Sequence, residues 1–250
     1  MTCRCLKKCK DKRSLIKKEI PSANISIYQL NLTSRNSIND FCKDLFRDFK
    51  SIDILINNAA VKEENKVKDE SGLNLNLSTN FLGPFLLTLK LLPLLSNEGK
   101  GKILNVISPS YFGGRINFSD FNKEKRKYNK YDSYAQSKMA LAMMTLSLNE
   151  MGEELNVSSL SIDPMSAFSH HGIPKSNFFF NIPNKAIHSL FLKSPLYASQ
   201  CYLKACIEDF ENNKDKVLTH LNWVWYTKYC KDKLTRDKLW LTAKKWTGID

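Results

Sequence analysis

Short apolar runs alternate along the chain with longer segments in which apolar residues recur at helical spacing. The runs predict four strands, at residues 25–30, 52–56, 102–107 and 157–162. The longer segments predict helices at about residues 34–49, 71–95 and 131–151. The second strand has almost no polar break, as a strand covered on both faces of a parallel sheet requires.

This alternation predicts an α/β fold, a doubly wound, Rossmann-like parallel sheet with helices on both faces. The chain has neither repeats nor Gly- or Ser-rich linkers, so residues 1–250 are expected to form a single domain. Ligands of such sheets bind beyond the carboxyl ends of the strands. The segments that follow residues 30, 56, 107 and 162 are therefore expected to carry the chemistry.

The composition indicates a globular protein, with 42% hydrophobic residues, and the net charge of +13 is unusually high. Lysines gather at residues 7–18 and 228–245. Such a charge suits nucleic acid, anionic lipid or a phosphorylated cofactor, and it equally suits two solvated helix faces. Because the chain has no nucleic-acid-binding motif and no regular interleaving of aromatic and basic residues, no nucleic-acid partner is expected.

The ends of the chain and its apolar windows bear on its location. The N-terminus is basic, but no apolar stretch of the secretory type follows before Pro21. The most apolar window, residues 81–95, contains Gly83, Pro84, Lys90 and Pro93 and is expected to be a buried helix. The cytoplasm or the cytosolic face of a membrane is the expected location, with peripheral membrane association and a homo-oligomer left open.

Seven cysteines give no even disulfide framework, although Cys3, Cys5 and Cys9 cluster near the N-terminus. A metal site would need a fourth ligand, and none is evident. Reduced thiols are therefore expected. His170 and His171 are adjacent, and adjacent side chains rarely lie on the same face, so the two are not expected to bind one metal ion. No metal site is therefore expected.

The third predicted helix carries the strongest chemical signal. Tyr134 and Lys138 are four residues apart and project from the same helical face. An ammonium close to a phenol stabilises the phenolate and is expected to lower the pKa of Tyr134 from its ordinary value of about 10. Tyr134 would then exchange a proton with a substrate oxygen to which Ser108, just after the third strand, is hydrogen-bonded.

Three further segments make this pattern specific. Asn57-Asn58-Ala59-Ala60 follows a buried strand, Asn80 opens Asn80-Phe81-Leu82-Gly83-Pro84 in the long helix, and residues 103–107 lead into Ser108. In this order and spacing the chain resembles the short-chain dehydrogenase/reductase family along nearly its whole length. Lys127-Tyr128-Asn129 and Lys238-Leu239-Trp240 make it most similar to the retinol dehydrogenase group.

The resemblance implies a role for each matching position. Tyr134 would be the general acid/base, Lys138 would lower its pKa and hold the nicotinamide ribose, and Ser108 would contact the substrate oxygen. Asn80 would help to seat a proton-relay water. The cofactor would contact these residues: Arg4, Asn31, Leu32, Asn58, Ala59, Tyr134, Lys138, Pro164 and Ser169.

Arg4 bears on which cofactor is used. It falls where members of the family that prefer NADP have a basic residue that binds the 2′-phosphate. Members that use NAD have an acidic residue there. The resemblance therefore implies NADP(H), although Arg4 equally suits a plain surface position. Asn31 replaces the aspartate that usually faces the adenine, and an amide still accepts a hydrogen bond there.

The chain departs from the family at its N-terminus. The family begins with a strand and a T-G-x-x-x-G-x-G turn that binds the pyrophosphate, and nothing here matches them. Met1-Thr2-Cys3-Arg4 resembles the end of the second strand, so a strand–helix unit of roughly 30 residues is expected to be missing. By the family's strand order, its absence would leave a gap between unpaired strand edges.

The chain departs from the family at two further positions. Met165 replaces a glycine next to the nicotinamide, and Ala60 replaces the glycine that usually ends the family's N-N-A-G segment. One interpretation is an N-terminal truncation of a once-active enzyme, and the other is a diverged protein that no longer binds a cofactor. The four retained catalytic positions favour truncation.

Residues 166–195 are expected to cover the substrate. This segment is strongly apolar, with Phe178, Phe179 and Phe180 in a row, and suits a lipophilic alcohol or carbonyl such as a retinoid. Alternatively, these apolar residues would complete the core or form a dimer contact. The hypothesis is thus an NADP(H)-linked oxidoreductase. The rival is a non-catalytic binding or scaffold protein, or an inactive fragment.

Overall fold

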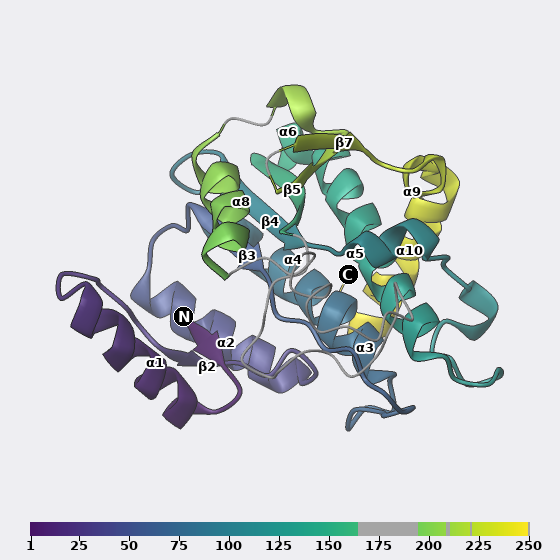
Figure 1. Ribbon diagram of the computed structural model, residues 1–250, viewed down its shortest axis with the longest axis horizontal. Helices are drawn as coiled ribbons and strands as arrows, with labels where there is room; N and C mark the ends of the chain where they lie inside the picture. Colours follow the sequence, from purple (N-terminus) through teal and green to yellow (C-terminus); the bar gives the residue numbers. More distant parts are fainter. Residues whose placement is uncertain (165–194, 209–210, 221, 250) are drawn as a thin grey trace, which may run out of the picture.

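A five-stranded sheet forms the centre of the molecule (Figure 1). The computed structural model describes residues 1–164, 195–208, 211–220 and 222–249. The strands are adjacent in chain order: β3 (Ile54–Asn57), β4 (Gly101–Val106), β5 (Val157–Asp163), β6 (Lys216–Thr219) and β7 (Asn222–Trp225). The first four are parallel and β7 is antiparallel to β6. The predicted α/β fold with a parallel sheet is confirmed.

A second, very short sheet lies at the N-terminus. It pairs β1 (Thr2–Cys3) with β2 (Tyr28–Gln29) in parallel, and α1 (Leu6–Glu19) connects them. The strand predicted at residues 25–30 is therefore only two residues long. Within the described chain, β3 pairs with β4 alone, and Ile56 of β3 is 41% exposed. The described strands thus form two separate sheets, with unpaired edges as expected.

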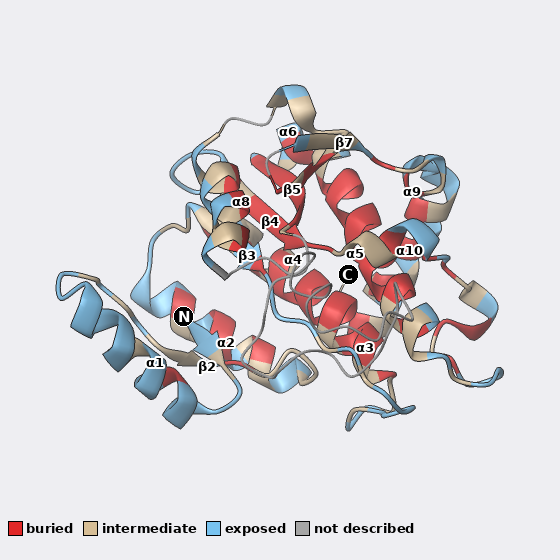
Figure 2. Cartoon of the chain, viewed as in Figure 1, coloured by how far each residue is buried: buried red, intermediate tan, exposed pale blue. Residues whose placement is uncertain are grey.

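Helices cover both faces of the sheet (Figure 1). One layer contains α2 (Arg35–Asp48), α4 (Gly83–Leu95) and α5 (Lys130–Glu150), and the opposite face carries α8 (Pro195–Ile207). Ser34 caps α2 as predicted, because its side chain accepts a hydrogen bond from the Ser37 N–H. Buried residues concentrate in the sheet, α4 and α5, whereas α1 is mostly exposed (Figure 2).

The long apolar helix predicted at residues 71–95 consists of three segments. A turn of α-helix, α3 (Leu75–Leu77), is capped by Asn74 and runs into a π-helical turn, η1 (Ser78–Leu82), and then into α4. Residues 75–95 form the one helix among those described that is long and apolar enough to cross a membrane, and 72% of its most apolar window is buried inside the fold. The buried helix expected from residues 81–95 is confirmed.

The C-terminal segment packs on the outside of this layer. The short helix α9 (Lys228–Lys231) and α10 (Lys233–Thr247) cover α4 and α5. The Phe85 and Trp240 rings meet edge to face, with centroids 4.9 Å apart, and Arg236 pairs with Glu150. The remaining short elements are η2 (Pro109–Gly113), η3 (Phe118–Asp120), α6 (Gly152–Leu155) and η4 (Glu211–Asn213). Helix α5 is consequently buried along most of its length.

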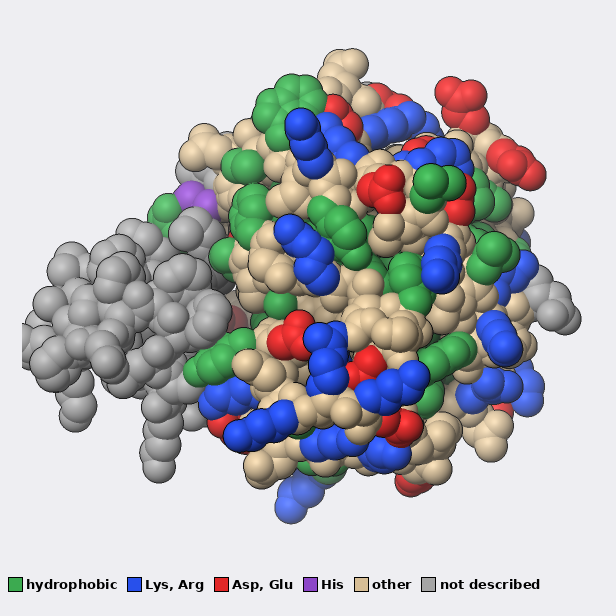
Figure 3. Space-filling view, turned by 90° about the vertical axis from the view of Figure 1, so that its right-hand side faces the viewer, with side chains coloured by type: hydrophobic (Ala, Val, Ile, Leu, Met, Phe, Trp, Pro, Cys, Tyr) green, Lys and Arg blue, Asp and Glu red, His purple; other side chains and the backbone are tan. Residues whose placement is uncertain are grey.

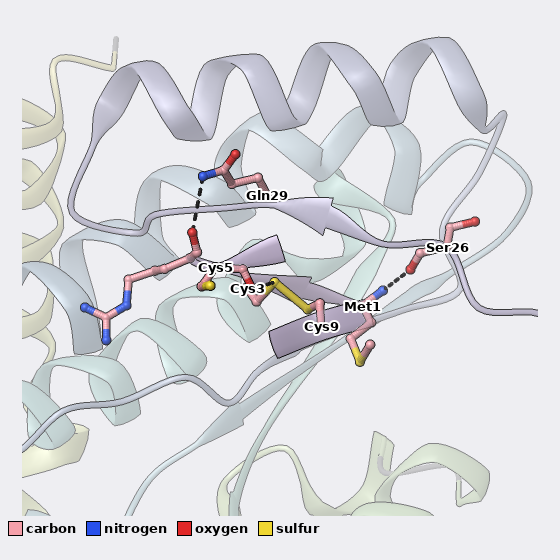
Figure 4. The surroundings of a disulfide bond; sticks show 7 residues. Met1, Cys3, Cys5, Cys9, Ser26 and Gln29 are labelled. Atoms are coloured by element: carbon pink, nitrogen blue, oxygen red, sulfur yellow. Dashed lines mark hydrogen bonds between the residues drawn. A yellow bond between two sulfur atoms is a disulfide. The ribbon is translucent and has the colours of Figure 1, made fainter. Parts of the chain in front are cut away.

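Cys3 and Cys9 form a disulfide, so the expectation of reduced thiols is wrong for this pair (Figure 4). Helix α1 starts directly after β1 and brings the two Cα atoms to 6.3 Å, within the range that a disulfide spans. The Met1 ammonium donates to the Ser26 carbonyl (2.8 Å) in the same region. Cys5 is a free, exposed thiol.

Candidate active site

Ser108 lies two residues beyond β4, at the carboxyl edge of the sheet. Val106 pairs with Ile162 of β5, and the Ile107 N–H donates to the Ile162 carbonyl, so the strand ends are held in register. The Ser108 backbone is extended, and its hydroxyl accepts a hydrogen bond from the Ser110 N–H (3.4 Å) at the start of η2. The serine is half-buried at this edge.

Tyr134 and Lys138 reach the same edge from α5. Asn129 caps this helix by accepting hydrogen bonds from two backbone N–H groups. Lys138 is 2% exposed, and its Nζ donates to the Val106 carbonyl oxygen (2.7 Å) at the end of β4. The same Nζ lies 5.7 Å from the centroid of the Tyr134 ring. A buried ammonium therefore fixes α5 against the strand that leads into Ser108.

Burial determines the protonation of this pair. Desolvation lowers the pKa of Lys138 to about 8, and the Asp163 carboxylate opposes this by stabilising the ammonium. Burial raises the pKa of Tyr134, contact with the Ser108 hydroxyl lowers it, and Asp163 raises it again. The predicted lowering of the Tyr134 pKa is therefore wrong for this structure, because desolvation dominates and the Lys138 ammonium is bonded to the Val106 carbonyl.

Asn80 is fully buried in the π-helical turn η1. Its Nδ2 donates to the Val61 carbonyl oxygen and to Ser137 Oγ, both at 2.9 Å, and its Oδ1 accepts from the Val61 N–H (2.8 Å). π-Helical turns often mark functional sites because the extra residue re-aims a side chain. The turn here directs Asn80 to Ser137, next to Lys138, so the long helix, the loop after β3 and α5 are held together. Its role toward a relay water stays a prediction.

The residues expected to contact the adenosine end follow β1, β2 and β3. Asn58 and Ala59 are exposed just beyond β3, and Asn58 Oδ1 accepts a hydrogen bond from the Tyr202 hydroxyl of α8 (2.7 Å). Asn31 follows β2, and its Oδ1 accepts from the N–H and hydroxyl of Thr33. The three strand ends thus carry accessible or half-buried polar groups.

Arg4 and Leu32 complete this set. Arg4 is exposed between β1 and α1, and its carbonyl oxygen accepts from Gln29 Nε2 (3.2 Å; Figure 4). Leu32 packs against Gly83, where an added Cβ would stand 2.3 Å from the Leu32 carbonyl oxygen. Gly83 is thus required for close backbone approach between this loop and α4.

The end of β5 is described only up to Pro164, which is half-buried. Met165, Ser169 and the tandem histidines lie outside the described residues, as does nearly all of the predicted substrate cover at residues 166–195. Their predicted roles stay untested. No cluster of metal-ligating side chains occurs among the described residues.

Two residues near Tyr134 escaped the sequence analysis. Asp163 is 5% exposed at the end of β5 and acts electrostatically on both Tyr134 and Lys138. Lys62 places its Nζ 4.5 Å from the Tyr131 ring centroid and 5.6 Å from that of Tyr134. An acid at the end of a predicted strand was the signal for Asp163, whereas only the tertiary structure brings Lys62 to α5.

The donor set fits a nicotinamide dinucleotide at both of its ends. A buried ammonium and a phenol, groups that bond to a ribose and to a reacting oxygen, stand at the end of β4, while Arg4, the half-buried Asn31 and the exposed Asn58 follow β1, β2 and β3. For the pyrophosphate between them, none of the glycines in the described residues belongs to a T-G-x-x-x-G-x-G turn.

The chain is similar to known proteins of one family. The family described as short chain dehydrogenase matches residues 2–168. Mouse retinol dehydrogenase 13 is 29% identical over 255 residues, which cover 100% of this chain and 76% of the relative. Its human counterpart is 30% identical, with 100% and 77% covered. Mouse polyprenol dehydrogenase is 36% identical over 142 residues, which cover 55% of this chain and 42% of the relative.

Solved structures share the fold. An uncharacterised protein from Mycobacterium paratuberculosis has a TM-score of 0.76 at 23% identity, with 99% of this chain and 83% of that one covered. NADPH-bound carbonyl reductase from chicken fatty liver has a TM-score of 0.66 at 20% identity, with 90% and 86% covered. Together with the family match over most of the chain, these findings show that the protein belongs to the short-chain dehydrogenase family.

Proposed function

We propose that this protein is an NADP(H)-linked oxidoreductase that moves hydride between nicotinamide and a lipophilic alcohol/carbonyl pair such as a retinoid. The observation that carries the proposal is the convergence of Ser108, Tyr134 and Lys138 at the carboxyl end of β4. Relatives named for retinol and polyprenol support the lipophilic substrate.

Each side chain would have a distinct role in the reaction. The bound cofactor supplies or accepts the hydride. Because the pKa of Tyr134 is raised, its hydroxyl is protonated at neutral pH and donates to the carbonyl oxygen during reduction. Ser108 hydrogen-bonds the same oxygen and stabilises developing charge. Lys138, with a pKa of about 8, is mostly charged at neutral pH and stabilises the phenolate that results.

Replacing Tyr134 tests this assignment directly. The Tyr134→Phe variant is expected to lower kcat with an all-trans-retinal probe by about a thousandfold while NADPH affinity stays within about threefold, since proton transfer typically contributes 10²–10⁴ in rate. Tyr131→Phe, one turn earlier on the same helix, is the matched control and should keep wild-type turnover. Undiminished turnover in Tyr134→Phe would reject the catalytic assignment.

The preference for NADP(H) is proposed from Arg4, which is exposed at the end of β1. Arg4→Asp is expected to weaken NADPH by tenfold or more and to change NADH little, because only the former carries a 2′-phosphate. Lys17→Asp, at the far end of α1, controls for the change in net charge. Isothermal titration calorimetry with both cofactors measures the effect. An equal loss of affinity for NADPH and NADH would show that Arg4 does not bind the 2′-phosphate.

A non-catalytic binding role is the second candidate. The observation in its favour is the exposed edge of β3, with Ile56 41% exposed, together with the described glycines that form no phosphate-binding turn. Titration of the folded 250-residue protein with NADPH separates the two. A saturable rise in Tm would support the enzyme, whereas a cooperative melting curve that NADPH does not shift would support the binding role.

A further inference from the structure

The outer face of α10 carries an exposed line of alternating leucine and lysine side chains. Leu234, Lys238, Leu241 and Lys245 follow the i, i+4, i+7, i+11 spacing of one helical face. The two leucines are 80% and 68% exposed, although Leu239 of the same helix is 2% exposed in the core. These four residues are called the Leu–Lys stripe below.

Trp225 at the end of β7 extends the stripe beyond the N-terminal end of α10. Its side chain is 58% exposed, and Lys216 and Lys231 each place Nζ 4.7 Å from its ring centroid. Lys231 ends α9, three residues before Leu234. A large aromatic ring and two leucines of the C-terminal segment are therefore exposed to water, and Lys231 links them, since it contacts Trp225 and precedes Leu234 by three residues.

This region is strongly cationic. Residues 216–247 contain eight Lys and Arg and two Asp, although Arg236 is buried against Glu150 and Lys231 lies 3.5 Å from Asp215. Both acids are engaged locally, because Asp237 pairs with Lys233 (2.8 Å) and Asp232 caps α10 by accepting from the Thr235 N–H. The face turned to the viewer in Figure 3, the side of Figure 1 on which α9 and α10 lie, shows more basic than acidic side chains, with apolar ones between them.

We infer that the Leu–Lys stripe and Trp225 dock the protein on a membrane surface rich in anionic phospholipid. Leucine and tryptophan side chains of a surface helix enter the boundary between headgroups and acyl chains, while lysines extend their stems and keep the ammonium among the phosphates. Each lysine near such a surface adds electrostatic attraction. The face offers both components at once.

The same features argue against other partners. Nucleic acid would bind the lysines but would leave Leu234 and Leu241 in water, because a phosphate backbone offers them no apolar contact. Protein interfaces are depleted in lysine, whereas lysines flank every exposed apolar residue here. An anionic bilayer satisfies the apolar and the cationic groups together.

Helix α1 supplies a matched control. Seven of its fourteen residues are basic and Leu15 is 52% exposed, yet it lies on the side of the molecule opposite α10 (Figure 1). If only the overall positive charge attracted the protein to the membrane, changes on α1 and on α10 would weaken binding equally. Docking through α10 predicts that changes on α1 leave binding almost unaffected.

Co-sedimentation of the 250-residue protein with vesicles tests the inference. The vesicles are phosphatidylcholine alone or phosphatidylcholine with 30% phosphatidylserine, in 0.1 M salt. We expect binding to the anionic vesicles only, and a loss of at least tenfold in partition for Leu234→Ser/Leu241→Ser and for Lys238→Glu/Lys245→Glu. Leu15→Ser and Lys12→Glu should stay within twofold, and Tyr134→Phe should bind like the wild type, which separates docking from catalysis.

Several results would overturn the inference. Unchanged binding of the double leucine variant, with its Tm equal to that of the wild type, would show that the stripe does not enter the bilayer. Equal losses for the α1 variants would indicate nonspecific charge attraction. No binding to anionic vesicles, with salt-sensitive binding of a single-stranded RNA oligonucleotide instead, would assign the face to nucleic acid.

Discussion

The central sheet and the N-terminal β1–α1–β2 region are held by different means. Strands β4 and β5 pair over six residues, from Gly101 with Val157 to Val106 with Ile162, and α4 and α5 bury them on one face. Strands β1 and β2 pair over two residues, and Cys9 is the one buried residue of α1. The first region is a packed core, and the second depends on local bonds and a disulfide.

The candidate site is divided along the same line. Ser108, Tyr134, Lys138 and Asn80 all belong to the packed region, where Lys138 is bonded to β4 and Asn80 is bonded to α5. Arg4 and Asn31 belong to the N-terminal region, where the Arg4 carbonyl accepts from Gln29 of β2 and the Asn31 side chain accepts from Thr33. The groups that would move the proton are thus preorganised by the fold, and the groups that would hold the adenosine end are less so.

A buried polar network inside the packed region gives the largest expected effect. The Asn105 amide accepts from Asn57 (2.8 Å) and donates to Thr145 (3.0 Å) and Ser159 (3.3 Å), which joins β3, β4, β5 and α5. Asn105→Leu removes three buried hydrogen bonds and places an apolar side chain against polar neighbours, although Asn57 keeps its bond to Thr88 and Thr145 keeps its bond to Leu141. We expect about 3–4 kcal/mol less stability in urea unfolding, since each buried hydrogen bond contributes about 0.5–1.5 kcal/mol.

Asn31→Leu is the matched change in the N-terminal region. It removes only bonds to Thr33, and we expect a loss of about 1 kcal/mol or less. Equal losses for the two variants would contradict the contrast between the two regions.

The buried Lys138 ammonium gives the next effect, as a dependence of stability on pH. Below about pH 8 both states hold the proton; above it the folded state releases the proton, whereas the unfolded chain keeps it up to about 10.5. The unfolded state then binds more protons, so this residue makes stability rise between these pH values. Compared with Lys138→Met, the wild type should gain about 3 kcal/mol of stability over that interval, since one pKa unit corresponds to about 1.4 kcal/mol. Parallel profiles would show that Lys138 is not desolvated.

The disulfide is expected to have the smallest effect on the whole molecule. Cys3→Ser removes a link that closes a short loop between β1 and α1. Global urea unfolding should change by about 0.5 kcal/mol or less, because the core does not depend on this region, whereas amide hydrogen exchange in α1 should accelerate at least tenfold. A cooperative loss of protection in β4 and β5 would show that the two regions unfold together.

The sequence predicted the elements of the packed region closely. The short strand signals at residues 102–107 and 157–162 gave β4 and β5, and the apolar stripe with Ser34 as its cap gave α2 within a residue. It failed where local pattern carries too little information. The π-helical turn at Asn80 lies inside a helix whose sequence pattern gives no sign of an interruption before Gly83, and the two-residue strand β2 lies in a segment that predicted a six-residue strand.

Spacing within one helix placed Tyr134 and Lys138 on the same face, and the apolar run before Ser108 placed it at a strand end, so the sequence by itself determined the chemical groups of the candidate site. Only the tertiary structure decided their protonation, because desolvation and the Asp163 carboxylate depend on how β5 and α5 pack. It also decided that Leu234 and Leu241 face water while Leu239 enters the core. Periodicity defines the faces of a helix, but which face is covered depends on the neighbours that the fold supplies.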